Sequence, residues 1–166
     1  DRAEEMFRRI MELDELRLLP DVRKLLALTL LKRKKFSEAE KILTEATRDR
    51  KSDLQLMNML GYCLERQNKL FEAEKVLSRV IENDPENANG LNSLAYVYCR
   101  LEKNYTDALS MVKKALTKEP KNASYLDTLG MLYANRGNTA AARKTLKRAL
   151  EHAPGNAEIL SHLTSV

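Results

Sequence analysis

The side chains with the most reactive chemistry are few and widely separated along the chain. There are two cysteines, Cys63 and Cys99, and two histidines, His152 and His162. No cysteine and histidine stand at the spacing of a metal site or of a nucleophile and its base. The cysteines are interpreted as small packing residues and the histidines as structural residues. The sequence therefore predicts no metal, no cofactor and no catalytic centre, and the unpaired thiols favour a reducing compartment such as the cytoplasm.

A second set of polar residues recurs at a fixed interval of 34 residues. The interval joins three pairs of like residues: Asn58 and Asn92, Tyr62 and Tyr96, and Arg66 and Arg100. A carboxamide both donates and accepts hydrogen bonds, so a ladder of carboxamides pairs with the backbone of an extended peptide regardless of its sequence. Tyrosine adds flat apolar contact with a polar tip, and arginine favours a carboxylate ligand. This is the chemistry of recognition rather than of reaction.

Basic residues gather in two places, and the net charge is +5 with a pI of about 9.2. The two groups are Lys32–Lys35, and Arg143, Lys144, Lys147 and Arg148. Nucleic-acid binding would place such groups on one face with aromatic residues between them. Here they are split between the ends of the chain, and acidic residues are interleaved elsewhere, as in Glu38–Lys41. This pattern favours a solvated helical face over a nucleic-acid or membrane surface.

The elements that must position all these residues repeat along the chain. Three segments close on Pro85, Pro120 and Pro154, at intervals of 35 and 34 residues. Apolar residues recur within them at i, i+3, i+4 and i+7 without strict alternation, which predicts helices and no strands. Intervals of this length are typical of helix–turn–helix arrays. The proline at each end cannot continue a helix and sets the turn into the next repeat.

Small residues recur where two antiparallel helices would cross at close range. If each repeat is numbered so that the first small residue is position eight, further small residues follow at positions 20 and 27. The three positions hold Ala27, Gly61, Ala95 and Gly130; Ala39, Ala73, Ala108 and Ala142; and Ala46, Val80, Ala115 and Ala149. Gly130 is expected to face Ala142 and Ala149. Larger residues at positions seven and 24, such as Leu129 and Leu146, are expected to fill the space between repeats.

This arrangement of small, aromatic and proline positions resembles the tetratricopeptide repeat (TPR) family. The best match, Ala123–Pro154, carries the family positions Leu126, Gly130, Tyr133, Gly137, Ala142, Ala149 and Pro154. The resemblance implies an all-α, right-handed α-solenoid of antiparallel helix pairs, the TPR superhelix. It divides a single array, residues 1–166, into full repeats at 20–53, 54–87, 88–122 and 123–156. The departures from the family pattern are Arg23, Lys51 and one extra residue within Leu101–Tyr105.

The two ends of the chain have the pattern of half repeats. Residues 1–19 are predicted to form the second helix of an earlier repeat, with Ala3, Phe7 and Ile10 at packing positions. Residues 157–166 are predicted to form the first helix of a further repeat. Natural arrays finish with a polar outer face, which this segment lacks, so the chain is expected to be a piece of a longer protein. Apolar ends of this kind are expected to favour self-association.

In the TPR family the first helices of the repeats line a concave groove, and the resemblance assigns nine residues of this chain to it. They are Asn58, Tyr62, Arg66, Asn92, Tyr96, Arg100, Asp127, Met131 and Asn135. The alternative is that Tyr62 and Tyr96 only pack between neighbouring first helices.

One subgroup of the family holds acidic chaperone tails in a two-carboxylate clamp of lysine, asparagine and arginine. Of the five clamp positions only Lys24 fits, since the others hold Leu28, Met59, Asn89 and Ser93. This subgroup is therefore excluded.

The function expected from the sequence is non-catalytic binding of a protein or peptide segment in the groove. The first alternative is a regulatory or targeting arm of a larger enzyme or of an assembly or secretion machine. The second is binding of nucleic acid or anionic membrane by the basic surface, which would weaken steeply with salt.

Overall fold

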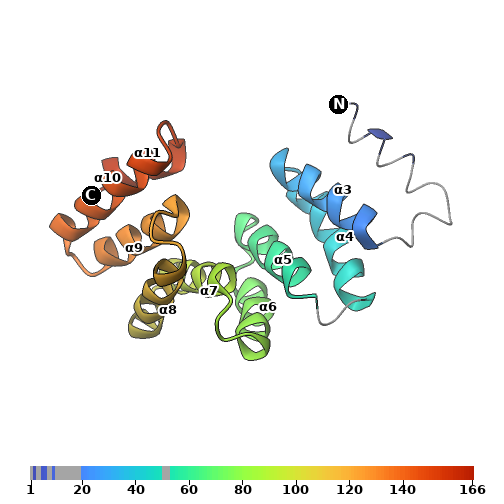
Figure 1. The fold of residues 1–166 in the computed structure, drawn as a ribbon, viewed down its shortest axis with the longest axis horizontal. Coiled ribbons are helices and arrows are strands. Elements are labelled where there is room, and N and C mark those ends of the chain that lie inside the picture. The colour runs from blue at the N-terminus through green and yellow to red at the C-terminus, as the bar shows by residue number, and fades with distance from the viewer. Residues whose placement is uncertain (1, 3–4, 7–8, 10–19, 50–52) are drawn as a thin grey trace. The chain divides into compact units, whose positions relative to one another are not determined.

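The structure, a computed structural model, describes residues 2, 5–6, 9, 20–49 and 53–166 (Figure 1). Apart from the first few of these, the described residues form nine helices and no strand. The helices are α3 (Pro20–Lys32), α4 (Phe36–Asp49), α5 (Leu54–Arg66), α6 (Leu70–Asn83), α7 (Ala88–Arg100), α8 (Tyr105–Lys118), α9 (Ala123–Asn135), α10 (Thr139–His152) and α11 (Ala157–Thr164). The expectations for Ala3, Phe7, Ile10 and Lys51 fall outside the described residues.

Helices of two kinds alternate along the chain. The first helices of the repeats, α3, α5, α7 and α9, have 13 residues each, and the second helices, α4, α6, α8 and α10, have 14. The two helices of a repeat pack on each other, as α7 does on α8 and α9 on α10. The predicted fold class, an all-α helical repeat, is confirmed. None of the described helices is long and apolar enough to cross a membrane.

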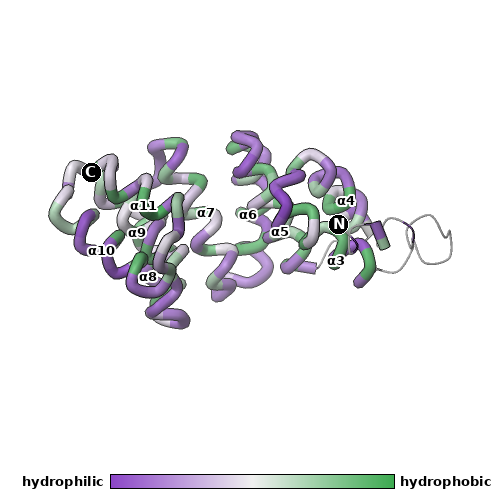
Figure 2. Tube along the Cα trace, turned by 90° about the horizontal axis from the view of Figure 1, so that it is seen from above, coloured by the Kyte–Doolittle hydropathy of each residue, from purple (hydrophilic) through white to green (hydrophobic). Residues whose placement is uncertain are grey.

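The chain divides into two compact units, residues 1–80 and residues 81–166. They are called here the N-terminal unit and the C-terminal unit. The N-terminal unit contains α3, α4, α5 and most of α6, and the C-terminal unit contains α7 to α11. Apolar and polar residues are mixed along each helix (Figure 2). This is the amphipathic pattern of a helix that buries one of its sides.

Four helices, α5, α7, α9 and α11, begin after a polar capping residue. The side-chain oxygens of Asp53, Asn87, Asn122 and Asn156 accept hydrogen bonds from backbone N–H groups in the first turns of α5, α7, α9 and α11. These N–H groups have no partner inside the helix, so a cap of this kind stabilises a helix by about 1 kcal/mol. The caps stand one repeat apart and fix where each of these helices starts.

The turns between the two helices of a repeat share one geometry. Two residues beyond the end of each first helix stands a residue with positive φ: Lys34, Asn68, Glu102 and Gly137, with φ of 59°, 61°, 52° and 73°. The next residue donates its N–H back into the last turn of the helix, as Lys103 does to the Tyr98 carbonyl and Asn138 does to the Tyr133 carbonyl. This is the Schellman motif, which satisfies carbonyls that the helix end leaves open.

The third of these turns is longer than the others. Three residues separate α9 from α10, whereas four, Leu101–Asn104, separate α7 from α8. The extra residue is Asn104, which has φ 49° and ψ 37° and so adopts the left-handed conformation just before α8. In this conformation its side chain makes no capping hydrogen bond, whereas Asn138 caps α10 by accepting from the Ala141 N–H.

The close crossing of each helix pair differs from the expected one in its nearest residue. A Cβ atom added to Gly130 would lie 2.6 Å from Leu146 Cγ, and the nearest atom of Ala142, its carbonyl oxygen, would be 3.5 Å away. Gly61 stands in the same way against Leu77, with 2.5 Å to Cγ. Gly130 therefore faces Ala142 as expected, through the Ala142 backbone, but Leu146 is the nearer neighbour. A leucine at position 24 closes over the small residue, because its branched side chain reaches across the crossing while an alanine does not.

The last helix packs on the fourth repeat through a small apolar cluster. Ile159 of α11 is buried together with Leu126 of α9 and Leu146 and Ala149 of α10. Leu163 is only partly buried against this cluster, and Leu160 is 42% exposed. α11 therefore covers the end of the fourth repeat and presents an apolar side chain of its own to solvent.

Candidate functional site

The nine residues assigned to the groove lie on three first helices and are spaced four residues apart on each. They form the rows Asn58, Tyr62 and Arg66 on α5; Asn92, Tyr96 and Arg100 on α7; and Asp127, Met131 and Asn135 on α9. Residues four apart share one face of a helix. Each row is thus a strip of side chains on one helix face.

The α5 row belongs to the N-terminal unit. Tyr62 is 44% exposed, and its ring meets the ring of Phe36 at the start of α4 edge to face, with 6.4 Å between centroids and 77° between planes. Asn58 and Arg66 are half-buried. Tyr62 therefore packs against α4 and still offers nearly half of its surface to solvent.

The α7 row contains the most buried of the three asparagines. Asn92 is 7% exposed, and its Oδ1 atom is buried and accepts no hydrogen bond from any described residue. Tyr96, one turn further along, is half-buried. The exposed guanidinium of Arg100 lies 6.0 Å from the centre of the Tyr96 ring. The α7 row thus has a carbonyl oxygen without a described hydrogen-bond partner at Asn92 and a cationic side chain at Arg100.

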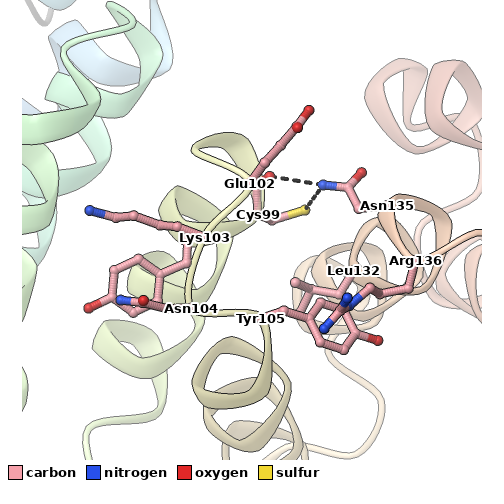
Figure 3. A pocket seen from close by; sticks show the side chains of 9 residues that line it. Cys99, Glu102, Lys103, Asn104, Tyr105, Leu132, Asn135 and Arg136 are labelled. Carbon is pink, nitrogen blue, oxygen red and sulfur yellow. Dashed lines mark hydrogen bonds between the residues drawn. The ribbon is translucent and has the colours of Figure 1, made fainter.

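The α9 row is tied to its neighbours by side-chain hydrogen bonds. Asp127 is 7% exposed, and its two carboxylate oxygens lie 2.9 and 3.1 Å from Nδ1 of His162 on α11. Asn135 donates through Nδ2 to the Cys99 carbonyl of α7 at 2.9 Å, with Cys99 Sγ at 3.4 Å (Figure 3). Met131 lies between Asp127 and Asn135 along α9 and is half-buried.

His162 takes part in this surface, although the sequence analysis treated it as merely structural. The hydrogen bond to Asp127 raises the pKa of His162 above its usual value of 6.5, while burial and the charge of Arg100 act in the opposite direction. The signal in the sequence was weak: Asp127 and His162 stand 35 residues apart, close to one repeat. The pair joins α9 to α11 and gives the buried carboxylate of Asp127 a hydrogen-bond partner.

The two cysteines have the properties of buried packing residues. Burial raises the pKa of Cys63 to about 11 and the pKa of Cys99 to about 12. Both are therefore neutral thiols near pH 7, and neutral thiols are poor nucleophiles. The described residues contain no group of three or more His, Cys, Asp or Glu side chains that is placed to hold a metal ion.

The basic residues differ between the second helices. On α8, Lys114 and Lys118 both reach the Glu86 carboxylate, the latter at 3.3 Å. On α10 four basic side chains are exposed, with a single acidic residue, Glu151, on the helix: they are Arg143, Lys144, Lys147 and Arg148. α10 thus lacks the interleaving of acidic and basic residues that α4 has around Glu38–Lys41.

Comparison with known proteins decides the family. Tetratricopeptide repeat models match residues 24–88 and residues 100–164, and together they span most of the chain. The chain belongs to the tetratricopeptide repeat family. A comparison with curated proteins finds no matching relative of this TPR protein.

Solved TPR structures have the same fold at low sequence identity. A thermophilic TPR protein from Thermus thermophilus superposes with a TM-score of 0.76 at 21% identity, over 98% of this chain and 87% of that one. YrrB, described as a TPR protein with an unusual peptide-binding site, gives 0.68 at 20% identity, over 99% of this chain and 83% of YrrB. MamA from Desulfovibrio magneticus gives 0.66 at 19% identity, over 87% and 81%.

Membership of the TPR family gives the general role. TPR arrays are protein–protein interaction modules, and proteins of this family are generally non-catalytic scaffolds. This TPR protein is accordingly a protein-interaction module.

Proposed function

We propose that this TPR protein binds an extended peptide segment along the exposed faces of its first helices, without catalysing a reaction. In the C-terminal unit the segment would lie across α7, α9 and α11. The observation that carries the proposal is the carboxamide of Asn92. The residue is only 7% exposed, and its Oδ1 atom accepts no hydrogen bond from any described residue.

An unmatched buried carbonyl oxygen destabilises the folded protein, typically by about 1–3 kcal/mol. A half-turn of the Asn92 carboxamide exchanges the positions of Oδ1 and Nδ2, so the group can present either an acceptor or a donor to a ligand. Both are what the backbone of an extended peptide requires. A peptide bound here would give Asn92 hydrogen-bond partners that the protein itself does not supply.

The residues next to Asn92 suggest what else the peptide contacts. Tyr96 supplies flat apolar area one turn along α7, and Met131 supplies adaptable apolar area on α9. Asp127 is hydrogen-bonded to His162 at 2.9 Å, and Arg100, at the end of the α7 row, would favour an acidic residue of the ligand. The Asn135 side-chain amide donates a hydrogen bond to the Cys99 carbonyl, and this contact helps to fix the spacing of α7 and α9.

In the N-terminal unit, Asn58, Tyr62 and Arg66 repeat the α7 row with the same residue types and spacing. We extend the proposal to this row, with the exposed part of Tyr62 as its apolar contact. The description of YrrB as a peptide-binding TPR protein supports a peptide as the class of ligand.

The test begins with selection of binders from a random twelve-residue peptide display library on the immobilised full chain. The dissociation constant of a selected peptide is then measured by fluorescence anisotropy. Changing Asn92 and Tyr96 together to Ala is expected to weaken binding by about 2 kcal/mol, or roughly 30-fold, as for a central hot spot. Circular dichroism should show unchanged helical content.

The matched control is Lys144→Ala with Lys147→Ala on α10, which is expected to leave the affinity within a factor of two. The proposal is wrong if the lysine pair abolishes peptide binding and the Asn92 and Tyr96 pair does not. Failure to enrich any peptide on the folded protein also overturns it.

A second candidate is supported by the unshielded basic face of α10, where Arg143, Lys144, Lys147 and Arg148 are exposed together. It would bind nucleic acid or an anionic membrane. A phosphate-driven complex of this kind loses affinity linearly with log salt concentration, with a slope close to the number of phosphates contacted. A weak salt dependence of the measured affinity excludes it.

We also propose two further kinds of partner. The first is a larger assembly, of which the module is a regulatory or targeting arm. The second is another copy of the chain, bound through α11, where Leu160 is 42% exposed. Self-association predicts a mass that rises with protein concentration and that Leu160→Glu returns to the monomer.

A further inference from the structure

A cavity of about 400 Å³ lies beside the longer turn, between α7, α8 and the end of α9 (Figure 3). Its size is within the range of small-ligand sites. Three places in the chain line it: Tyr98 and Cys99 near the end of α7, the segment from Glu102 to Tyr105 at the start of α8, and Leu132 and Asn135 of α9 with Arg136 just beyond that helix. Tyr98 and Leu132, at 8% and 1% exposure, give it an apolar floor.

Two cations line the cavity from opposite sides, and each is placed over an aromatic ring (Figure 3). Lys103 Nζ lies 5.7 Å from the centre of the Tyr98 ring, and the guanidinium carbon of Arg136 lies 4.2 Å from the centre of the Tyr105 ring. Attraction between a cation and a ring face of this kind reduces the freedom of the cation. Tyr105 therefore holds Arg136 in one orientation at the rim, as the stacked pair in Figure 3 shows.

Arg136 forms no ion pair with any described residue. A guanidinium whose face is covered by a ring still has its N–H groups pointing outward in its own plane. That edge matches the two oxygens of a carboxylate, and the bidentate pair is among the stronger hydrogen-bonded interactions in proteins. The preorientation by Tyr105 lowers the entropy that such a pair would otherwise lose.

The other lining groups narrow the class of ligand. Glu102 is the acidic group of the lining, and its negative charge favours a singly charged ligand over a doubly charged phosphate beside Arg136. The apolar floor fits a side chain next to the carboxylate.

We propose that this cavity binds a peptide carboxylate, with Arg136 as the bidentate partner. The carboxylate belongs either to a peptide C-terminus or to an aspartate or glutamate side chain. The site depends on Arg136 and Tyr105, which belong to none of the three rows described above. It therefore stands even if the peptide binding proposed for Asn92 fails.

The experiment titrates the full chain, labelled with ¹⁵N, with four probes, and follows the Arg136 side-chain Nε–H signal and the backbone amides of Glu102–Tyr105. The probes are N-acetyl-Leu-Phe with a free carboxylate, the same dipeptide as its C-terminal amide, N-acetyl-Leu-Glu-amide and inorganic phosphate. One bidentate pair with a small apolar contact is expected to give a dissociation constant of about 1 mM. The amidated dipeptide is expected to bind at least fivefold more weakly than the free acid.

The first and third probes distinguish a C-terminal from a side-chain carboxylate, and saturable binding of either one at these residues supports the proposal. Tighter binding of phosphate than of both carboxylates overturns it. So does equal binding of the acid and the amide of the first dipeptide, or shifts confined to other parts of the protein.

Variants test the role of Arg136 itself. Arg136→Gln is expected to weaken the carboxylate probe at least fivefold, and Arg136→Lys, which keeps the charge but not the planar fork, at least threefold. The control is Arg148→Gln on α10, which removes the same charge away from the cavity and is expected to change nothing. Because Arg136 is exposed, both variants should fold, and unchanged amide spectra outside the turn will show it. Wild-type affinity in Arg136→Gln would overturn the proposal.

Discussion

The two helix pairs of the C-terminal unit, α7–α8 and α9–α10, form equivalent crossings and turns with different residues. At the crossing α9 has Gly130 against Leu146, while the corresponding positions of α7 and α8 hold Ala95 and Val112, all fully or almost fully buried. A smaller residue on one helix accompanies a larger one on the other. The total volume at the crossing is thus similar, which is what a close-packed interior requires.

The turns differ more than the crossings. The α9–α10 turn has Gly137 at its left-handed position and Asn138 as an N-cap. The α7–α8 turn has Glu102 at the same position and adds Asn104, a second left-handed residue, which leaves α8 without a side-chain cap. Left-handed geometry is unfavourable for residues other than glycine by about 1–2 kcal/mol, and less for asparagine. The α7–α8 turn is therefore the less stable of the two, and it is the one that borders the cavity.

The largest effect is expected at the crossing. Gly130→Leu should lower the free energy of unfolding by roughly 3 kcal/mol, because even a Cβ atom would lie 2.6 Å from Leu146 Cγ. Chemical denaturation followed by circular dichroism measures the change. Met131→Leu, a substitution of similar volume at the next residue, should cost less than about 1.5 kcal/mol.

The same crossing offers a test of the volume rule. Gly130→Ala with Leu146→Val rebuilds the α7–α8 combination in the α9–α10 pair, and we expect it to be more stable than Gly130→Ala alone. If the second substitution gives no recovery, the facing of Gly130 and Leu146 does not determine the packing here. An unchanged melting curve for Gly130→Leu would contradict the arrangement altogether.

A smaller effect of opposite sign is expected at the two turns. Gly137→Ala should destabilise the protein by about 1 kcal/mol, since alanine is disfavoured at φ 73°. Glu102→Gly should stabilise it by up to about 1 kcal/mol, because glycine adopts the φ of 52° without strain. The two variants are measured by chemical denaturation under identical conditions. Changes of the same sign in both would show that the turns are not equivalent in backbone geometry.

The smallest effect concerns the junctions between repeats and depends on pH. Neutral hydrogen bonds join α7 to α9: Asn135 donates to the Cys99 carbonyl, and the Tyr125 hydroxyl donates to Asn89 Oδ1 at 2.8 Å. By contrast, α9 and α11 are joined by Asp127 and His162. The raised pKa of His162 means that protonation stabilises the docked α11.

That stabilisation is complete below the ordinary histidine pKa of 6.5 and is lost as the pH rises through the higher folded-state pKa. Hydrogen exchange, corrected for the intrinsic pH dependence, should show α11 opening more readily above this range, while the α7–α9 junction does not change. The charged groups that act on His162 are Asp127, Glu158 and Arg100. His162→Gln should remove the pH dependence, and its persistence in that variant would assign the effect to another group.

Much of the fold could be predicted from the sequence because its signals are local. The small residues, the prolines and the apolar period specify which segments are helices and where they turn, and the all-α repeat fold followed directly. The extra residue near Leu101–Tyr105 could also be counted from the sequence. Its consequence could not, since the conformation of Asn104 depends on how the Schellman motif at Glu102 has already directed the chain.

The site could be predicted only in part for a related reason. The spacing of Asn92, Tyr96 and Arg100 places them on one helix face. It does not reveal that Asn92 is 7% exposed with an unmatched oxygen, because burial depends on the neighbouring helices. Likewise, position alone does not reveal that Leu146 lies nearer to Gly130 than Ala142 does, because side-chain length also decides contacts across a crossing. The pairing of Asp127 with His162 joins residues whose types do not repeat along the chain.

Each compact unit contains one buried cysteine, and the reaction of that cysteine with a thiol reagent can report local opening of the unit. Cys63 lies in the N-terminal unit at 0% exposure and Cys99 in the C-terminal unit at 3%, and the described residues contain no disulfide between them. A thiol reagent can reach either sulfur only when the surrounding helices separate, so its labelling rate reports the opening equilibrium of that unit. The sequence has no tryptophan to serve as a fluorescent probe. Mass spectrometry of the labelled protein can nevertheless distinguish the two thiols. Local opening of the N-terminal unit and of the C-terminal unit can thus be measured separately in the wild-type chain, without any engineered label.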